Sequence, residues 1–204
     1  MHAPSWRVLL LGGVSGTGKS TAAKTISRNR GIAWVQVDDL RLALERSLTT
    51  LPEGMKPLGF FHQADVWSLP APALCDGLIR VGEVMSPAIE VVTENHDDQN
   101  DPAIIEGDGI LPSLFSRSSV RERVATGRVK GVFLIEPDRD ELCRNMLNRG
   151  RGYEQRTVAA QRREAEATWR FGQWLELEAS RLGLPVVRPR PWDSLPDRLL
   201  EAVI

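Results

Sequence analysis

Eight residues near the N-terminus have the composition and spacing of a phosphate-binding loop. Segment 13–20 reads Gly-Val-Ser-Gly-Thr-Gly-Lys-Ser and matches the pattern GxxxxGK[ST] at every fixed position. The glycines let backbone N–H groups turn toward a phosphate, and the N-terminus of a following helix adds partial positive charge. Lys19 is then expected to bridge the β- and γ-phosphates of ATP, and the Ser20 hydroxyl to bind Mg²⁺. The residues expected to contact the nucleotide are Gly13, Ser15, Gly16, Thr17, Gly18, Lys19, Ser20 and Thr21.

Three charged residues follow the next apolar segment. A carboxylate at Asp38 can accept the proton of an acceptor hydroxyl during phosphoryl transfer, or hold Mg²⁺ through water. Arg41, one helical turn further on, can neutralise an acidic substrate. The alternative for both Asp38 and Asp39 is to cap a helix that we expect to begin near Leu40. We assign the catalytic and substrate-binding role to Asp38 and the cap to Asp39.

Two more acids, Glu106 and Asp108, follow the apolar segment 103–105. An apolar strand that leads into an acid is typical of the second carboxylate near the metal in nucleotide-binding sites. The alternative is a turn in which the neighbouring glycines only allow positive φ. We assign Asp108 to the metal with Ser20, and Glu106 to the substrate, although the spacing alone does not decide which acid faces Mg²⁺.

Arginines and glycines gather in segment 148–163, which has the composition of a mobile lid. Such a lid closes over the triphosphate and brings guanidinium groups to the developing charge. We assign Arg149 to catalysis and Arg156 to the nucleotide, whereas Arg162 and Arg163 fit a solvated helix equally well. Further along the chain, Arg190 lies in a proline-rich loop and could stack on adenine, or the loop could be a rigid connection.

Apolar segments alternate with helical ones, which predicts a parallel, three-layer α/β sheet. The expected strands are 7–12, 33–37, 103–105, 131–135 and 184–187. Segment 49–101 is a long insert whose second half shows helical periodicity, so we expect it to bind the acceptor. The polar run 94–101 is expected to be a solvated loop. The aromatic-rich stretch around Trp169 and Phe171 is interpreted as core.

Composition places limits on the class of protein. The chain has 204 residues, 42% of them hydrophobic and 26% charged, which fits one domain over residues 1–204. Neither a membrane span nor a signal peptide is evident, so we expect a cytoplasmic protein with no membrane partner. The net charge of −1 does not favour nucleic acid as a partner. The two cysteines lack the spacing of a zinc site, and the oligomeric state is not predicted.

The motifs together resemble those of a group of P-loop kinases. Segments 13–21, 37–41 and 144–150 are similar to those of the polynucleotide 5′-hydroxyl kinases and zeta toxins. This resemblance implies that Asp38 is the general base, that Arg41 contacts the acceptor and that Arg149 is a lid residue that stabilises the transferring phosphoryl group. It covers the core, about 7–39 and 103–149, and implies a fold like that of nucleoside monophosphate kinases.

The middle of the chain is similar to the 2-phosphoglycerate kinase family. The long helical segment 74–94, followed by Ile-Ile-Glu-Gly-Asp-Gly-Ile-Leu-Pro at 104–112, resembles that family's strand and its Glu-Gly-x-His-x-x-Pro motif. Gly109 stands where the family has histidine, and this departure leaves the acceptor open.

These patterns predict a kinase that uses ATP and Mg²⁺ to phosphorylate a hydroxyl group of a small molecule. A first alternative is a polynucleotide 5′-hydroxyl kinase, against which the near-neutral charge argues. A second is a nucleotide-dependent switch or binding ATPase. The guanine-reading motif of switch GTPases does not occur in the sequence.

Overall fold

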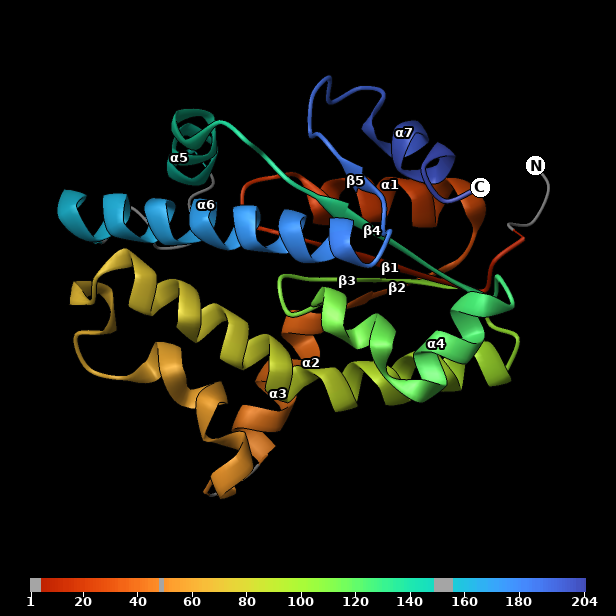
Figure 1. The fold of residues 1–204 in the computed structure, drawn as a ribbon, viewed down its shortest axis with the longest axis horizontal. Helices are drawn as coiled ribbons and strands as arrows, with labels where there is room; N and C mark the ends of the chain where they lie inside the picture. The colour runs from red at the N-terminus through yellow and green to blue at the C-terminus, as the bar shows by residue number, and fades with distance from the viewer. Residues whose placement is uncertain (1–4, 48–49, 149–155) are drawn as a thin grey trace.

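The computed structural model describes residues 5–47, 50–148 and 156–204. Within these residues, five parallel strands form one sheet in the order β2-β3-β1-β4-β5 (Figure 1). The strands are β1 Val8–Gly13, β2 Ala33–Gln36, β3 Ala103–Glu106, β4 Val129–Leu134 and β5 Val186–Val187. The five-stranded parallel α/β sheet predicted from the sequence is therefore confirmed.

Alternating side chains of the central strand β1 enter two different cores. Leu9 and Leu11 pack with Ile26 of α1 (Lys19–Arg30) and with residues of α7 (Leu195–Glu201). Val8 and Leu10 belong to the core on the opposite face. Both faces of β1 are buried, which explains why its sequence is a continuous apolar run.

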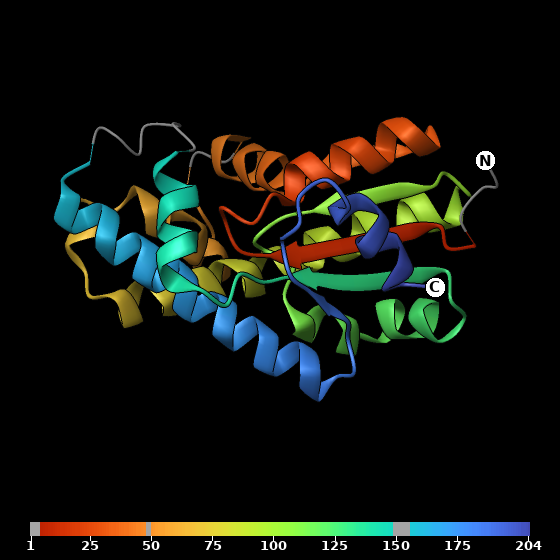
Figure 2. The same cartoon turned by 90° about the horizontal axis from the view of Figure 1, so that it is seen from above.

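Three helices cover that opposite face, on the far side of the sheet from α1 and α7 (Figure 1). They are α3 (Ala71–Asp98), α4 (Ser118–Ala125) and α6 (Val158–Arg181). The remaining elements are α2 (Val37–Ser47), α5 (Arg139–Leu147), η1 (Glu53–His62), η2 (Val66–Ser68) and η3 (Pro112–Ser116). In Figure 2, β1 and β4 run toward the end of the molecule that holds α5 and the beginning of α6.

Helix α2 begins earlier than expected. It starts at Val37, directly after β2, and not near Leu40. Asp38 and Asp39 therefore lie inside its first turn, and the expectation that Asp39 caps a helix beginning at Leu40 is wrong. Carboxylates in a first turn still interact favourably with the helix dipole.

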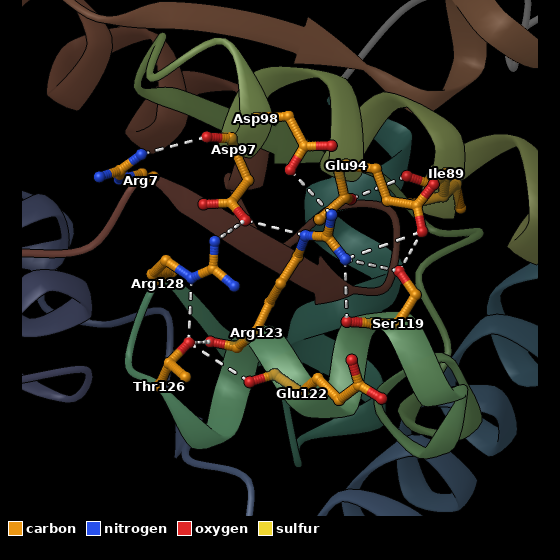
Figure 3. Close-up of polar contacts among 11 residues, drawn as sticks. Arg7, Ile89, Glu94, Asp97, Asp98, Ser119, Glu122, Arg123, Thr126 and Arg128 are labelled. Carbon is orange, nitrogen blue, oxygen red and sulfur yellow. Dashed lines mark hydrogen bonds and ion pairs between the residues drawn. The ribbon is translucent and has the colours of Figure 1, made fainter.

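The insert is helical, but its last part differs from the prediction. The expected solvated loop at 94–101 is wrong over Glu94–Asp98, which belongs to α3. Asp97 is fully buried, and its Oδ2 lies 2.8 Å from Nε of Arg123 and 3.0 Å from a guanidinium nitrogen of Arg128 (Figure 3). A guanidinium nitrogen of Arg7 also donates to the Asp97 carbonyl oxygen. These contacts fix the end of α3 against α4 and against the residues that precede β1 and β4.

The predicted lid overlaps a long helix. Residues 158–163 form the first turns of α6, so this part of the predicted lid is helical, and its role as a lid stays a prediction. Residues 149–155, including Arg149, lie outside the described residues. Among the helices that the structure describes, none has the length and apolar composition needed to cross a bilayer.

Candidate functional site

The phosphate-binding loop has the conformation that its sequence predicts. Gly13, Gly16 and Gly18 adopt φ values of 132°, 83° and 81°, in the range that favours glycine. A Cβ atom at Gly13 would lie 2.2 Å from the Leu134 carbonyl oxygen, so a side chain there is excluded by backbone. The Thr17 hydroxyl donates to the Val14 carbonyl oxygen at 2.7 Å and closes the loop on itself.

Lys19, which begins α1, is held at the floor of this loop. Its Nζ donates to the Val14 carbonyl oxygen at 2.8 Å and lies 2.6 Å from Oδ1 of Asp108. The Ser15 hydroxyl donates to the other oxygen of Asp108 at 2.8 Å. Asp108 therefore connects the loop after β3 with the phosphate-binding loop.

Strand register explains why the predicted acids meet the loop. Glu106 ends β3, where it lies opposite Leu11 of β1 and Gln36 of β2. Asp38 follows Gln36 by two residues, and the glycine loop follows Leu11 in the same way. The parallel order β2-β3-β1 thus brings the carboxyl-terminal ends of these three strands to one edge of the sheet. Ligands of open α/β sheets bind at this edge.

Glu106 is the buried acid of the pair. Its side chain lies within hydrogen-bonding reach of Ser20 and within electrostatic range of Lys19, Asp108 and Asp38. Burial raises the pKa of the Glu106 carboxyl above its usual value, although Lys19 and the Ser20 hydroxyl act in the opposite direction. Of the two candidate acids, Glu106 is thus the one beside the hydroxyl expected to bind Mg²⁺.

Asp38 and Arg41 face a cavity beneath the insert. We call it the insert cavity; its volume is about 230 Å³. It is lined by Ser15, Val37, Asp38, Arg41, Phe61, Trp67, Leu74, Leu78, Val81, Met85, Asp108, Gly109, Glu164, Ala167, Thr168 and Phe171. The cavity therefore lies between the phosphate-binding loop, α2, the insert and α6.

Arg41 is paired with a carboxylate of its own helix. One of its terminal nitrogens lies 2.6 Å from Glu45 Oε1, and its Nε lies 3.7 Å from Asp38 Oδ1. Glu45 also contacts His62 of η1 through an Nε2–Oε2 distance of 3.0 Å. The Arg41 guanidinium is thus fixed at the cavity wall.

A second cavity lies over the phosphate-binding loop, and we call it the loop cavity. It is lined by Ser15, Gly16, Gly18, Lys19, Ser20, Thr21 and Asn145. Ser15 also lines the insert cavity, so the two cavities share a wall. Within the described residues, the buried Nδ2 of Asn145 has no hydrogen-bond partner. An amide donor of this kind can serve an anion in the loop cavity.

The proline-rich loop after β5 also reaches the phosphate-binding loop. A Cβ atom on Gly18 would lie 2.6 Å from the Trp192 ring, so this ring packs directly on the loop. Arg190 is held by two carboxylates, with distances of 2.6 Å to Glu136 Oε2 and to Glu141 Oε2. The partly exposed Trp192 ring and the Arg190 loop therefore both lie next to the phosphate-binding loop.

Two of the three described arginines of the predicted lid, Arg156 and Arg163, lie near the insert. The Arg156 guanidinium lies 3.7 Å from the centre of the Trp67 ring and pairs with Glu164. Arg163 donates to the Trp67 carbonyl oxygen at 3.0 Å. Arg156, which we expected at the nucleotide, thus borders the insert cavity, and Arg162 lies on the other side of α6 beside α5.

Four residues of the site were missed by the sequence interpretation: Trp67, Asn145, Glu164 and Trp192. Phe61 and Trp67 are stacked, with ring centres 5.7 Å apart. The aromatic composition of segment 60–67 could have indicated that this segment contributes to the site. Phe171 was expected to be core, and it is both buried and part of the cavity wall. For Trp192 and Asn145, no sequence spacing indicated a position next to the phosphate-binding loop.

Comparison with known proteins identifies the fold. No protein-family model and no curated protein matches the chain. A sugar kinase structure from Janibacter sp. HTCC2649 is 17% identical with a TM-score of 0.51, and the alignment covers 96% of this chain and 91% of that one. A protein from Chloroflexus aurantiacus J-10-fl is 14% identical with a TM-score of 0.51, covering 99% and 97%. A gluconokinase from Sinorhizobium meliloti 1021 is 16% identical with a TM-score of 0.49, covering 98% and 93%.

At these identities the first two comparisons bear on the fold alone. Together with the strand order and the complete GxxxxGK[ST] loop, they define the chain as an α/β protein with the P-loop small-molecule kinase fold. This confirms the resemblance to P-loop kinases that the motifs indicated.

Proposed function

We propose that this protein is a kinase that transfers the γ-phosphoryl group of ATP, with Mg²⁺, to a hydroxyl of a small molecule. The observation that carries the proposal is the shared wall of the two cavities. Ser15 lines both, and Asp38 lines the insert cavity on the other side of that wall. A phosphate held by the loop therefore adjoins a cavity that contains a candidate base.

The residues around the loop fit a nucleotide triphosphate and its metal. The positive-φ glycines leave room where a Cβ atom would collide, and Asn145 offers a buried amide donor. The Ser20 hydroxyl beside the Glu106 carboxylate is an oxygen donor set of the type that Mg²⁺ prefers. When bound, ATP would supply the phosphoryl group and Mg²⁺ would offset its charge.

In this proposal each residue of the candidate site has a separate role. Asp38 receives the proton of the acceptor hydroxyl, and Lys19 exchanges Asp108 for the β- and γ-phosphates. Arg41 fixes the acceptor at the cavity wall. Arg149, outside the described residues, keeps its proposed role in stabilising the transferring phosphoryl group. Glu106 is favoured over Asp108 for Mg²⁺ because it lies beside Ser20, whereas Asp108 faces the acceptor cavity.

The nucleotide base is assigned to the loop after β5. The Trp192 ring, packed on Gly18, offers an aromatic face for stacking, and Arg190 is fixed beside it by Glu136 and Glu141. Arg156 is proposed to reach the nucleotide only if it leaves Trp67 and Glu164. A cytoplasmic location stays a prediction from the sequence.

The proposal is tested by binding and turnover together. Lys19→Ala should weaken the binding of Mg²⁺-ATP by about tenfold to a hundredfold, because a charge-assisted contact contributes about 1.5–3 kcal/mol. Thr25→Ala on the exposed face of α1 is the matched control. Unchanged ATP affinity in Lys19→Ala, measured by isothermal titration calorimetry, would remove the basis for the proposal.

A further inference from the structure

The insert cavity has mainly apolar walls. The insert supplies Phe61, Trp67, Leu74, Leu78, Val81 and Met85, and α6 supplies Ala167 and Phe171. Phe61 and Trp67 are stacked, which makes one wall a continuous aromatic surface. Burying apolar ligand surface here is favourable by about 25 cal/mol per Å². The cavity is thus suited to a ligand that carries an apolar or aromatic body.

The charged side chains at this cavity are already paired within the protein. Among the lining residues that the structure describes, Arg41 is the single cation, and it pairs with Glu45, whose side chain is only 7% exposed. The bordering cations are paired as well, Lys19 with Asp108 and Arg156 with Glu164. Three carboxylates, those of Asp38, Asp108 and Glu164, line the cavity itself. An anionic ligand would have to displace a carboxylate from its partner and enter beside these acids.

Gly109 keeps the apolar wall close to the reacting end. A Cβ atom there would lie 3.2 Å from Val37 Cγ1 and 3.7 Å from Met85 Cβ, so a side chain at this position would lie in close contact with both neighbours. Gly109 stands where the 2-phosphoglycerate kinase family has histidine, so this position supplies no imidazole to the cavity. The end of the cavity beside Asp38 therefore has no basic group from the loop after β3.

We infer that the acceptor is an uncharged or cationic alcohol with an apolar, preferably aromatic, body, and not a phosphorylated or carboxylated polyol. This inference rests on the proposed function, in which a hydroxyl of the acceptor is phosphorylated and Asp38 receives its proton. The apolar body lies between the insert and α6, and the hydroxyl points toward Asp38 and Ser15. A positive charge on the ligand would take the place of Lys19 at Asp108 or of Arg156 at Glu164.

A matched set of alcohols tests the ligand class by binding alone. Hydrocinnamyl alcohol is neutral, phenylalaninol is cationic and phenyllactate is anionic, and all three carry the same phenyl group. Glycerol and gluconate lack the apolar body. Tryptophan fluorescence is followed during titration of each compound into the full chain. We expect a saturable change with the first two, and at least about tenfold weaker binding of phenyllactate, because burying an unpaired anion is costly.

Two variants show whether the signal comes from the insert cavity. Trp67→Phe should remove most of the fluorescence change, whereas Trp169→Phe, whose indole contacts the Pro137 carbonyl oxygen outside the cavity, should retain it. Equal or tighter binding of phenyllactate or gluconate would overturn the inference, and so would the lack of a saturable change with both aromatic alcohols.

A further variant tests the pairing of Arg41 with Glu45. Glu45→Gln removes the carboxylate that holds Arg41, so the binding of phenyllactate should strengthen by about threefold to tenfold. Asp39→Asn changes a nearby exposed acid of the same helix and should have no effect. Circular dichroism and retained ATP binding show that Glu45→Gln is folded. An unchanged preference in folded Glu45→Gln would contradict the role given to the Arg41–Glu45 pair.

Turnover separates this inference from the proposed function. The same compounds are incubated with Mg²⁺-ATP, and the gain of one phosphoryl group is followed by mass spectrometry. Phosphorylation of gluconate but not of the aromatic alcohols would keep the kinase and overturn the apolar acceptor. Saturable binding of aromatic alcohols without phosphorylation of any compound would keep the ligand class and contradict the kinase.

Discussion

The ammonium group of Lys19 lies 2.6 Å from the carboxylate of Asp108, a residue that also lines the cavity beneath the insert. This pair joins the phosphate-binding loop to the wall of the second cavity. Lys19 has another partner in the Val14 carbonyl oxygen, so its side chain is held in place before any nucleotide arrives. Phosphates in the loop would take over the contact that Asp108 provides.

The first prediction concerns the stability that this pair contributes. Asp108→Asn removes the charge partner of an ammonium group whose side chain is 6% exposed, and should lower the free energy of unfolding by about 1–3 kcal/mol. Urea unfolding of the nucleotide-free chain measures it. Saturating Mg²⁺-ATP should reduce the difference from wild type, because phosphates replace the lost partner. A loss of stability that persists in saturating ATP would argue against the exchange.

Asn145 provides a second prediction. Its buried Nδ2 lacks a partner among the described residues and lines the loop cavity. If this amide serves a phosphate, Asn145→Leu should weaken Mg²⁺-ATP binding by about threefold to tenfold without loss of stability, because an unsatisfied donor is removed. Calorimetric titration and urea unfolding measure the two effects, with exposed Asn29→Leu at the end of α1 as the control. ATP affinity equal to that of wild type would show that the amide has no part in binding.

The third prediction uses the pH dependence of Glu106. Burial raises the pKa of its carboxyl, so the folded chain keeps the proton to a higher pH than the unfolded chain. The Glu106 contribution to stability therefore decreases as the pH rises above the ordinary glutamate pKa of about 4.3 and through the folded pKa. Without nucleotide, Glu106→Gln should melt at a higher temperature than wild type at neutral pH.

The Glu106 variant is compared with Glu201→Gln, which changes an exposed acid of α7. Melting is followed by calorimetry across the acidic to neutral range. The two Gln variants should diverge as the pH rises, and Glu106→Gln should also need more Mg²⁺ for ATP binding. A lower melting temperature for Glu106→Gln at neutral pH would contradict the burial argument.

The sequence predicted the parts of this molecule whose signals are local. The loop at 13–20 and the apolar run of β1 each lie within one short segment, and both were found as expected. Glu106 and Asp38 were predicted as site residues because acids at the carboxyl ends of parallel strands meet at one edge of the sheet. Which acid lies beside Ser20 depends on the register of β3 against β1, and spacing does not contain this information.

Contacts between distant segments account for what the sequence did not predict. The run 94–101 looked like a loop because it is polar, yet Asp97 is buried by arginines of α4 and of the turn before β4. The start of α2 was missed because Val37 continues the β-rich composition of β2 into the helix. Glu164 and Trp67 became part of one cavity only through the packing of α6 on the insert.

The central claim is tested most directly by phosphoryl transfer from Mg²⁺-ATP to a hydroxyl compound, measured for wild type, Asp38→Asn and Asp39→Asn. The account predicts that wild type and Asp39→Asn add one phosphoryl group to at least one compound. Asp38→Asn should be slower by about a hundredfold or more, as expected for loss of a general base, while its ATP affinity is retained. Full phosphoryl transfer by an Asp38→Asn protein that binds ATP normally would contradict the account.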